Sequence, residues 1–235
     1  MSLANVSQGA AEVRRRFGAP AAALHLLHHV VNRFVFFDCL EVIVLERRDL
    51  RPLPAEQQAR FSSRLATRED LLQLHAQPGW DIGSDKLRAF DQGDQCVLSL
   101  IEGRIAGYTW VHALGRPELI AGLQLRLPDR YLYNYAGYTA PEFRGAGLQS
   151  MRHHSVLEQP DWRERHGLVG YVRWINYPSK KGQGRSGYRK VGSIWLLGSH
   201  RRYAAWFTPA LQRLGIARLQ PRPGQTTPDE APARV

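Results

Sequence analysis

Cysteine is scarce in this chain of 235 residues, which contains only Cys39 and Cys96. The two cysteines lie far apart in unrelated contexts, which excludes a disulfide framework and a CxxC metal site. Long hydrophobic runs are also missing, because none reaches the roughly 18 apolar residues that a membrane-spanning helix needs. These absences predict a protein of a reducing compartment, the cytoplasm, that spans no membrane.

Acidic residues are missing from one long stretch of the chain. No Asp or Glu lies between Arg165 and Pro228, whereas twelve Lys and Arg residues fall there. Because the whole chain carries a net charge of +11, the remainder is close to neutral. Such a segregated charge favours an anionic ligand: a polyphosphate cofactor, an acidic substrate, nucleic acid or an anionic membrane surface. The alternative is an ordinary basic, solvated face.

Composition and apolar periodicity divide the chain into three segments. Residues 1–33 predict an N-terminal helical extension, with an amphipathic helix over residues 11–33. Residues 34–219 predict one α/β domain. Residues 220–235 are rich in Pro and polar side chains that cannot build a core, which predicts a disordered tail.

Local patterns predict the elements of this domain. A β-branched and aromatic run from Phe34 predicts a long strand, and Thr67 is placed to cap a helix with an acidic first turn. A short helix near residues 84–90 precedes two apolar runs that meet at Glu102-Gly103, which predicts an antiparallel hairpin. The later elements are a strand at 130–139, a helix after Gly147, a strand at 168–176, a short helix ending near Lys190 and a strand at 193–198.

A glycine turn stands between the strand at 130–139 and the helix that follows it. The segment PEFRGAGLQ, residues 141–149, contains Gly145 and Gly147 just before a helical pattern. A helix N-terminus at such a turn can bind an anion, because its first amides lack intrahelical partners and the helix dipole adds positive charge. The segment is neither a Walker loop nor the GxGxxG of a dinucleotide fold.

The order of the motifs resembles the GNAT superfamily of N-acyltransferases over roughly residues 34–198. The segment SRLATREDLLQL is similar to the family's first strand end and helix, and EGRIAGYTWV is similar to its second hairpin. GYRKVGS resembles the Tyr-x-x-x-Gly-Phe signature that ends its fourth helix. The pyrophosphate loop of the family reads Q/R-x-x-G-x-G/A, and the matching residues are Arg144, Gly145, Ala146, Gly147, Leu148 and Gln149.

Three departures from the family pattern stand out. Gln149 replaces the usual Gly or Ala, and Ser193 replaces the usual Phe after Gly192. The connection between Asn176 and Tyr188 is lengthened by PSKKGQGRSG.

The resemblance implies a GNAT-like mixed sheet flanked by helices and a donor site for acetyl-CoA or another acyl-CoA. The turn residues 144–149 would bind the pyrophosphate, and the main chain at Tyr138 and Thr139 would pair with the pantetheine arm. Asn176 would touch the same arm, and Tyr188 would protonate the departing thiolate. From the residues alone, an Asn at a strand end more often forms a cap or turn, and a tyrosine that packs the end of a helix is nearly as well supported for Tyr188.

A general base for the acceptor amine is not evident. The strand RYLYNYAGYT lacks the Glu that many relatives carry, so Asp38, Glu41 or a chain of waters remains, and Glu142 lies too near the turn. The tyrosines of this strand line an acceptor pocket or fill the core.

Histidines suggest a metal site only weakly. His25, His28 and His29 lie on one predicted helix, and His153-His154 form a second group. No Cys, HExxH motif or nearby acidic ligand accompanies them, so packed or solvated histidines are favoured over zinc.

The sequence therefore predicts an acyltransferase that moves an acetyl or other acyl group from CoA to an amine on a small molecule or peptide. Transfer would occur by direct attack within a ternary complex, and a homodimer is compatible with it. A further alternative is the transfer of a longer acyl chain or an aminoacyl group, which is still an enzymatic acyl transfer but uses a different donor. The alternative from another class is an inactive GNAT-fold module that binds nucleic acid, the less favoured partner, or a membrane surface through its basic C-terminal half.

We predict that CoA binding weakens as salt is added. If the basic residues between Arg165 and Pro228 attract the phosphates of CoA, added ions screen that attraction. Calorimetric titration of CoA at low and high ionic strength measures the effect. An affinity that does not change with salt would assign the basic stretch to another partner, and salt-sensitive binding of nucleic acid or vesicles without any CoA affinity would favour the inactive module.

Overall fold

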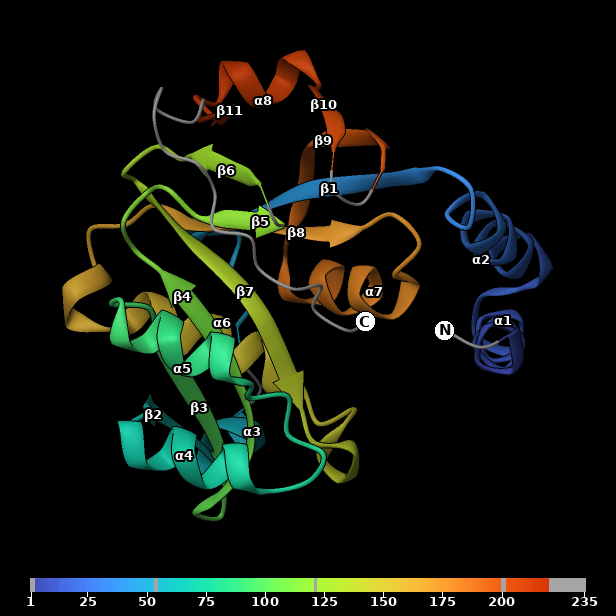
Figure 1. Ribbon diagram of the computed structural model, residues 1–235. Helices are drawn as coiled ribbons and strands as arrows, with labels where there is room; N and C mark the ends of the chain where they lie inside the picture. Colours follow the sequence, from blue (N-terminus) through green and yellow to red (C-terminus); the bar gives the residue numbers. More distant parts are fainter. Residues whose placement is uncertain (1–2, 53–54, 121, 200–201, 220–235) are drawn as a thin grey trace.

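The computed structural model describes residues 3–52, 55–120, 122–199 and 202–219 (Figure 1). The predicted tail, 220–235, lies outside the described residues. A large mixed sheet forms the centre. Its strands are β1 (Phe36–Glu46), β2 (Phe61–Leu65), β3 (Gln95–Ile101), β4 (Arg104–His112), β7 (Tyr131–Thr139), β8 (Gly167–Arg173), β9 (Arg189–Gly198) and β10 (Tyr203–Phe207).

The strand order in the described part of the sheet is β10-β9-β1-β8-β7-β4-β3-β2. Neighbouring strands run antiparallel, except that β7 and β8 are parallel. The hairpin predicted at Glu102-Gly103 joins β3 to β4 and is confirmed. A smaller sheet has the order β11-β6-β5, formed by β5 (Glu118–Ile120), β6 (Leu123–Arg126) and β11 (Ala217–Arg218).

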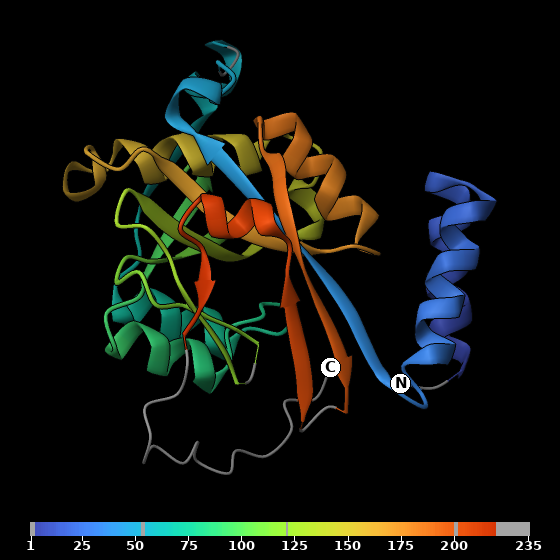
Figure 2. The ribbon, with the colours of Figure 1, turned by 90° about the horizontal axis from the view of Figure 1, so that it is seen from above.

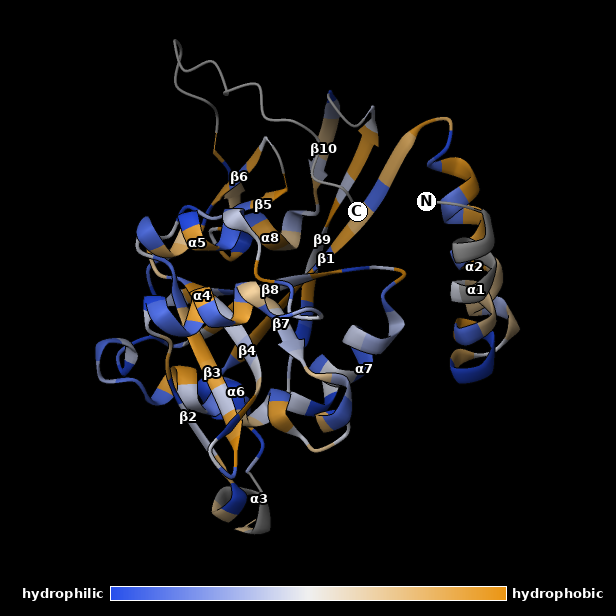
Figure 3. Ribbon diagram, turned by 60° about the horizontal axis from the view of Figure 1, so that its bottom comes forward, coloured by the Kyte–Doolittle hydropathy of each residue, from blue (hydrophilic) through white to orange (hydrophobic). Residues whose placement is uncertain are grey.

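Helices cover both faces of the main sheet, which confirms the predicted mixed α/β class (Figure 1). Among the described helices, none is long and apolar enough to cross a membrane. Figure 3 shows hydrophobic residues along the central strands and also on α2, whereas α7 is largely hydrophilic. The described helices are α1 (Leu3–Phe17), α2 (Ala19–Val31), α3 (Ala55–Arg60), α4 (Arg68–Ala76), α5 (Ser84–Asp91), α6 (Leu148–Glu158), α7 (Tyr177–Ser186) and α8 (Pro209–Arg213).

Two separate cores lie on opposite faces of the strands around β7. One contains Val156 and Leu157 of α6 packed against Leu132 and Leu168. On the other face, α4 and α5 cover one part of the sheet, and the small sheet with α8 covers another. Successive side chains of a strand point to opposite faces, so β7 presents alternate residues to the α6 side and to the α4 and α5 side.

The N-terminal segment is two helices rather than the single helix predicted over residues 11–33. α1 and α2 are separated by Gly18, whose φ of +88° suits glycine, and Pro20 lies in the first turn of α2. The two helices form a hairpin beside β1 (Figure 2). The strand predicted from Phe34 begins at Phe36, and the Phe34 side chain is 80% exposed.

The segment PSKKGQGRSG was expected to lengthen a connection, but it forms most of α7. Asn176 caps the helix by accepting a hydrogen bond from the Ser179 amide at 3.1 Å, and Pro178 lies in the first turn. Gly187, with φ of +100°, ends the helix, so it does not continue to the predicted end near Lys190. Tyr188 therefore lies between α7 and β9.

The helix predicted after Thr67 is confirmed as α4. The Thr67 hydroxyl accepts a hydrogen bond from the Asp70 amide, and the Asp70 carboxylate accepts one from the Thr67 amide at 2.8 Å. This capping box satisfies two amides that the helix leaves without partners. The strand patterns did not reveal β10 or the small sheet.

Candidate functional site

β7 and β8 separate partway along their length. Their parallel pairing covers only Tyr131 to Tyr133 on β7, whereas β7 continues to Thr139. Ala136 has a positive φ of +46°, and the register between β4 and β7 shifts near it, as in a β-bulge. A cavity of about 470 Å³ occupies the opening, lined by the edge of β7, Gly170 and residues of α6 and α7.

Tyr138 and Thr139, predicted to hold the pantetheine arm, both line this cavity. The Tyr138 ring lies against Trp80 and Tyr108, with ring centroids 5.3 and 5.5 Å apart, and its hydroxyl donates to the Gly79 carbonyl at 2.7 Å. These contacts hold the Tyr138 ring against the loop between α4 and α5.

A second cavity, of about 530 Å³, lies at the glycine turn and the start of α6. Gly145 and Gly147 have φ of +89° and +80°, and Gly147 is the N-cap residue of α6. No side chain caps this described helix end, so its first amides remain available to an anion. The two cavities adjoin, because Thr139, Arg144, Gln149 and Pro178 line both.

The predicted turn residues are nearly all found at this second cavity. Arg144, Gly145, Gly147, Leu148 and Gln149 line it. Ala146 instead packs against the apolar cluster beneath the turn.

Gln149, the departure from the family pattern, is accommodated by a glycine on the neighbouring helix. A Cβ atom at Gly182 of α7 would collide with the Gln149 side chain. The Gln149 side chain of α6 therefore packs against the backbone of α7 at Gly182, where no side chain is in the way.

The second cavity is basic. Arg16, Arg144, Lys181 and Arg185 line it, and its lining includes no Asp or Glu. Only two of these, Lys181 and Arg185, belong to the acid-free stretch of the sequence. Other cations of that stretch form ion pairs: Arg173 with Asp38, Lys180 and Lys190 with Glu41, and Arg189 with Glu46.

Tyr188 lies in the wall of the first cavity within a buried polar chain. Its hydroxyl accepts a hydrogen bond from Asn134 Nδ2 at 3.1 Å, and Asn134 Oδ1 accepts one from the Thr109 hydroxyl at 2.7 Å. The Tyr188 hydroxyl hydrogen is not used in this contact. Burial raises the pKa of Tyr188 above its ordinary value, so the phenol stays protonated.

Two neighbouring side chains of α6, Arg152 and His153, are buried under the same cavity. The Arg152 guanidinium donates to the Thr139 hydroxyl at 3.0 Å, and burial lowers its pKa to about 10. The His153 ring meets Tyr188 edge-on, with centroids 4.9 Å apart. Burial and the Arg152 charge lower the pKa of His153 to about 3, so this histidine is neutral at physiological pH.

Asn176, predicted to touch the cofactor arm, lines the first cavity and caps α7 at the same time. Its oxygen is used by the cap, which leaves its amide nitrogen facing the other direction. Histidines do not gather into a metal site: within the described ranges, no group of three or more His, Cys, Asp or Glu residues could hold an ion.

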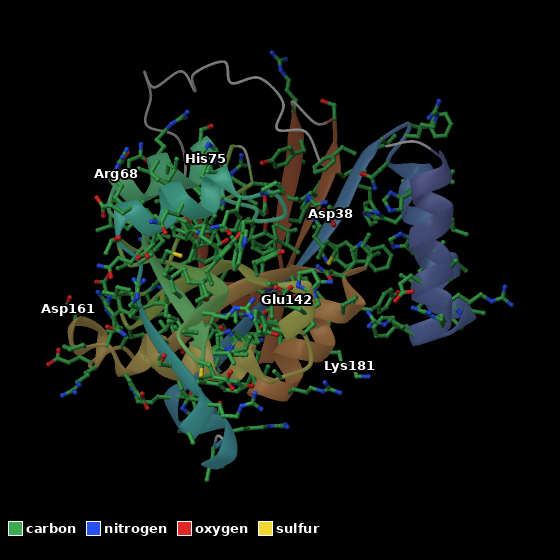
Figure 4. The ribbon with its side chains drawn as sticks, turned by 90° about the horizontal axis from the view of Figure 1, so that it is seen from below. Asp38, Arg68, His75, Glu142, Asp161 and Lys181 are labelled. Atoms are coloured by element: carbon green, nitrogen blue, oxygen red, sulfur yellow. The ribbon has the colours of Figure 1, made fainter. Side chains whose placement is uncertain are left out.

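The three carboxylates considered from the sequence as a general base, Asp38, Glu41 and Glu142, do not line the first cavity. Asp38 is buried beside Arg173, with 3.1 Å between Nε and Oδ2. Burial would raise the pKa of Glu41, but hydrogen bonds from Lys180 and Lys190 hold it below its ordinary value. Glu142 is exposed in the turn after β7, and Figure 4 shows it away from Asp38.

A different carboxylate, Asp94, forms a cluster that the sequence did not reveal. The Tyr135 hydroxyl donates to Asp94 Oδ2, and His112 Nδ1 donates to Asp94 Oδ1 at 2.6 Å. Tyr135 lines the first cavity and packs with the core on the α4 and α5 side, whereas its neighbour Asn134 contacts Tyr188. Groups able to exchange protons thus lie on both sides of β7.

Comparison with known proteins finds several solved structures to which the chain is similar. No family model and no curated protein matches the chain. A putative GNAT acetyltransferase from Novosphingobium aromaticivorans is 18% identical, with 70% of this chain and 66% of that chain covered and a TM-score of 0.43. A GCN5-related N-acetyltransferase from Kribbella flavida is 14% identical, with 77% and 64% covered and a TM-score of 0.46.

A Drosophila structural-genomics protein is 15% identical, with 77% of this chain covered and a TM-score of 0.45. This chain spans 58% to 66% of the length of these three matched structures. Two of them are described as members of the superfamily that the sequence resembles. At these identities and TM-scores the likeness assigns no activity to this chain.

We predict that Gly147→Trp blocks CoA binding, because an indole at the N-cap would fill the cavity over the first amides of α6. The Kd of CoA, measured by calorimetry, should rise roughly 100-fold or more. Gly93→Trp is the matched control, since Gly93 also has a positive φ, of +102°, and open space around it. Unchanged affinity in a folded Gly147→Trp protein would show that the assignment of this site is wrong.

Proposed function

We propose that this protein transfers an acetyl or other acyl group from CoA to an amine-bearing acceptor. The observation that carries the proposal is the opening between β7 and β8, which adjoins a basic cavity at the glycine-capped start of α6. A pyrophosphate at the α6 amides and an extended arm along the free edge of β7 would use both cavities at once. The thioester would then lie near Tyr188.

In this proposal the amine nitrogen attacks the thioester carbonyl, the new C–N bond forms and the C–S bond breaks. The thiolate leaves with the electron pair of that bond and takes a proton from the Tyr188 hydroxyl. Burial raises the pKa of the phenol, and the same desolvation raises the pKa of a thiolate beside it. The hydrogen bond from Asn134 orients the phenol while leaving its proton free to transfer.

For the amine, we assign proton removal to the cluster on the other side of β7. The Tyr135 oxygen takes the proton of the attacking nitrogen while its own hydroxyl proton passes to Asp94. The hydrogen bond from His112 holds the carboxylate in place. This route supplies the carboxylate that β7 itself lacks.

Tyr188→Phe should lower turnover roughly 100-fold or more while CoA affinity stays nearly constant, since the variant keeps the ring and removes only the hydroxyl group that donates the proton. The measurement is free-thiol release with an acceptor found by screening amines. Tyr131→Phe is the control, because Tyr131 is a buried tyrosine at the opposite end of β7. A wild-type rate for Tyr188→Phe would make Tyr188 a packing residue.

Asp94→Asn should reduce turnover by about 100-fold, because the amide cannot take the proton that Tyr135 passes on. CoA affinity, measured by calorimetry, should be unaffected, since the donor cavities lie toward α6 and α7. Asp91→Asn, on the exposed end of α5, serves as the control. The base assignment is wrong if Asp94→Asn, folded and binding CoA, turns over as fast as the control.

A further inference from the structure

The N-terminal hairpin touches the body of the protein at α7. The Phe17 ring stacks on Tyr177 with centroids 5.5 Å apart and planes at 29°. Val13, Ala21 and Ala22 bury against the same two rings. This apolar contact places the last turn of α1 at the rim of the basic cavity, where Arg16 and Phe17 line the wall.

The wall formed by the hairpin and α7 carries a group of cations. Lys181 and Arg185 are four residues apart on α7 and therefore share one face of the helix. Figure 4 shows Lys181 on the side of α7 that looks toward the hairpin. Arg16 reaches the cavity from α1, and its Nε atom also lies 3.1 Å from Glu12 Oε1.

These cations belong to other elements than the groups assigned to the pyrophosphate. The α6 amides, the glycine turn and Arg144 suit two bridged phosphates. Arg16 of α1 and Lys181 and Arg185 of α7 line the same cavity, and no Asp or Glu is in its lining. A ligand that carries a pyrophosphate and a further, separate phosphate could use both groups.

We propose that Arg16, Lys181 and Arg185 form a subsite for a phosphate monoester, the 3′-phosphate on the ribose of CoA. The inference rests on the proposed function and extends it, because it makes the N-terminal hairpin part of the donor site. Arginine and lysine together suit a dianionic phosphate: the guanidinium offers paired donors, and the ammonium offers a point charge. The subsite distinguishes CoA from 3′-dephospho-CoA.

The test compares the affinities of CoA and 3′-dephospho-CoA for the full chain by calorimetry at low salt. Arg16→Gln should weaken CoA binding about tenfold and leave 3′-dephospho-CoA binding within about twofold of the wild type. Arg15→Gln is the matched control: Arg15 lies in the same turn and contacts the same Glu12, but it is not among the residues that line the basic cavity. The control should bind both nucleotides as the wild type does.

Lys181→Gln provides a second variant outside the hairpin and should give the same selective loss. Equal losses for the two nucleotides in Arg16→Gln and Lys181→Gln, or no loss in either variant, would overturn the subsite while the wild type still binds CoA. Failure of the wild-type protein to bind either nucleotide would instead overturn the proposed function, and the subsite with it.

Discussion

The short parallel pairing of β7 and β8 is the constraint on which the candidate site depends. The two strands hold each other for three residues and then part, so the remaining edge of β7 faces a cavity instead of a neighbour. β8 is kept in place on its other side by a long antiparallel pairing with β1, and β7 by its pairing with β4. These outer pairings hold the two strands apart, so β7 and β8 do not come together along the rest of their length.

An opening inside a sheet leaves main-chain N–H and C=O groups without a neighbouring strand. Polar side chains are therefore needed nearby, and burying them lowers stability. Asn134, Thr109 and Tyr188 meet this demand through one hydrogen-bonded chain. Arg152 does so only in part: among the described residues, its Nε and Nη1 atoms are buried without a hydrogen-bond partner. Burying such groups costs free energy, and proteins retain such costs most often at functional sites.

The sequence predicted those parts of the site that are formed by residues adjacent in the chain. The glycine turn was predictable because Gly145 and Gly147 must adopt positive φ directly before a helix. The short helix predicted to end near Lys190 corresponds to α7, but its bounds were not predictable from composition, since its glycines and lysines resemble a loop. The caps at Asn176 and Gly187 fix where the helix begins and ends.

The clusters around the opening could not be predicted, because their members come from distant segments. Asp94, His112 and Tyr135 meet only after β3, β4 and β7 are paired in register. Arg16 reaches the basic cavity through the break at Gly18, which the expected single helix did not contain. Long-range pairing leaves no periodic mark in the sequence, and this limits prediction of a site more than prediction of a fold.

The position of β1 has a consequence for the order of events during synthesis. β1 is the first strand of the sheet to leave the ribosome, yet its partners are β8 and β9, near the other end of the described chain. Its apolar residues, Leu40 and Val42 through Leu45, remain unpaired while most of the polypeptide is made. Contacts between such distant segments form slowly, and unpaired apolar strands aggregate during the delay. Chaperone supply during translation should therefore govern the yield of folded protein more than its final stability does.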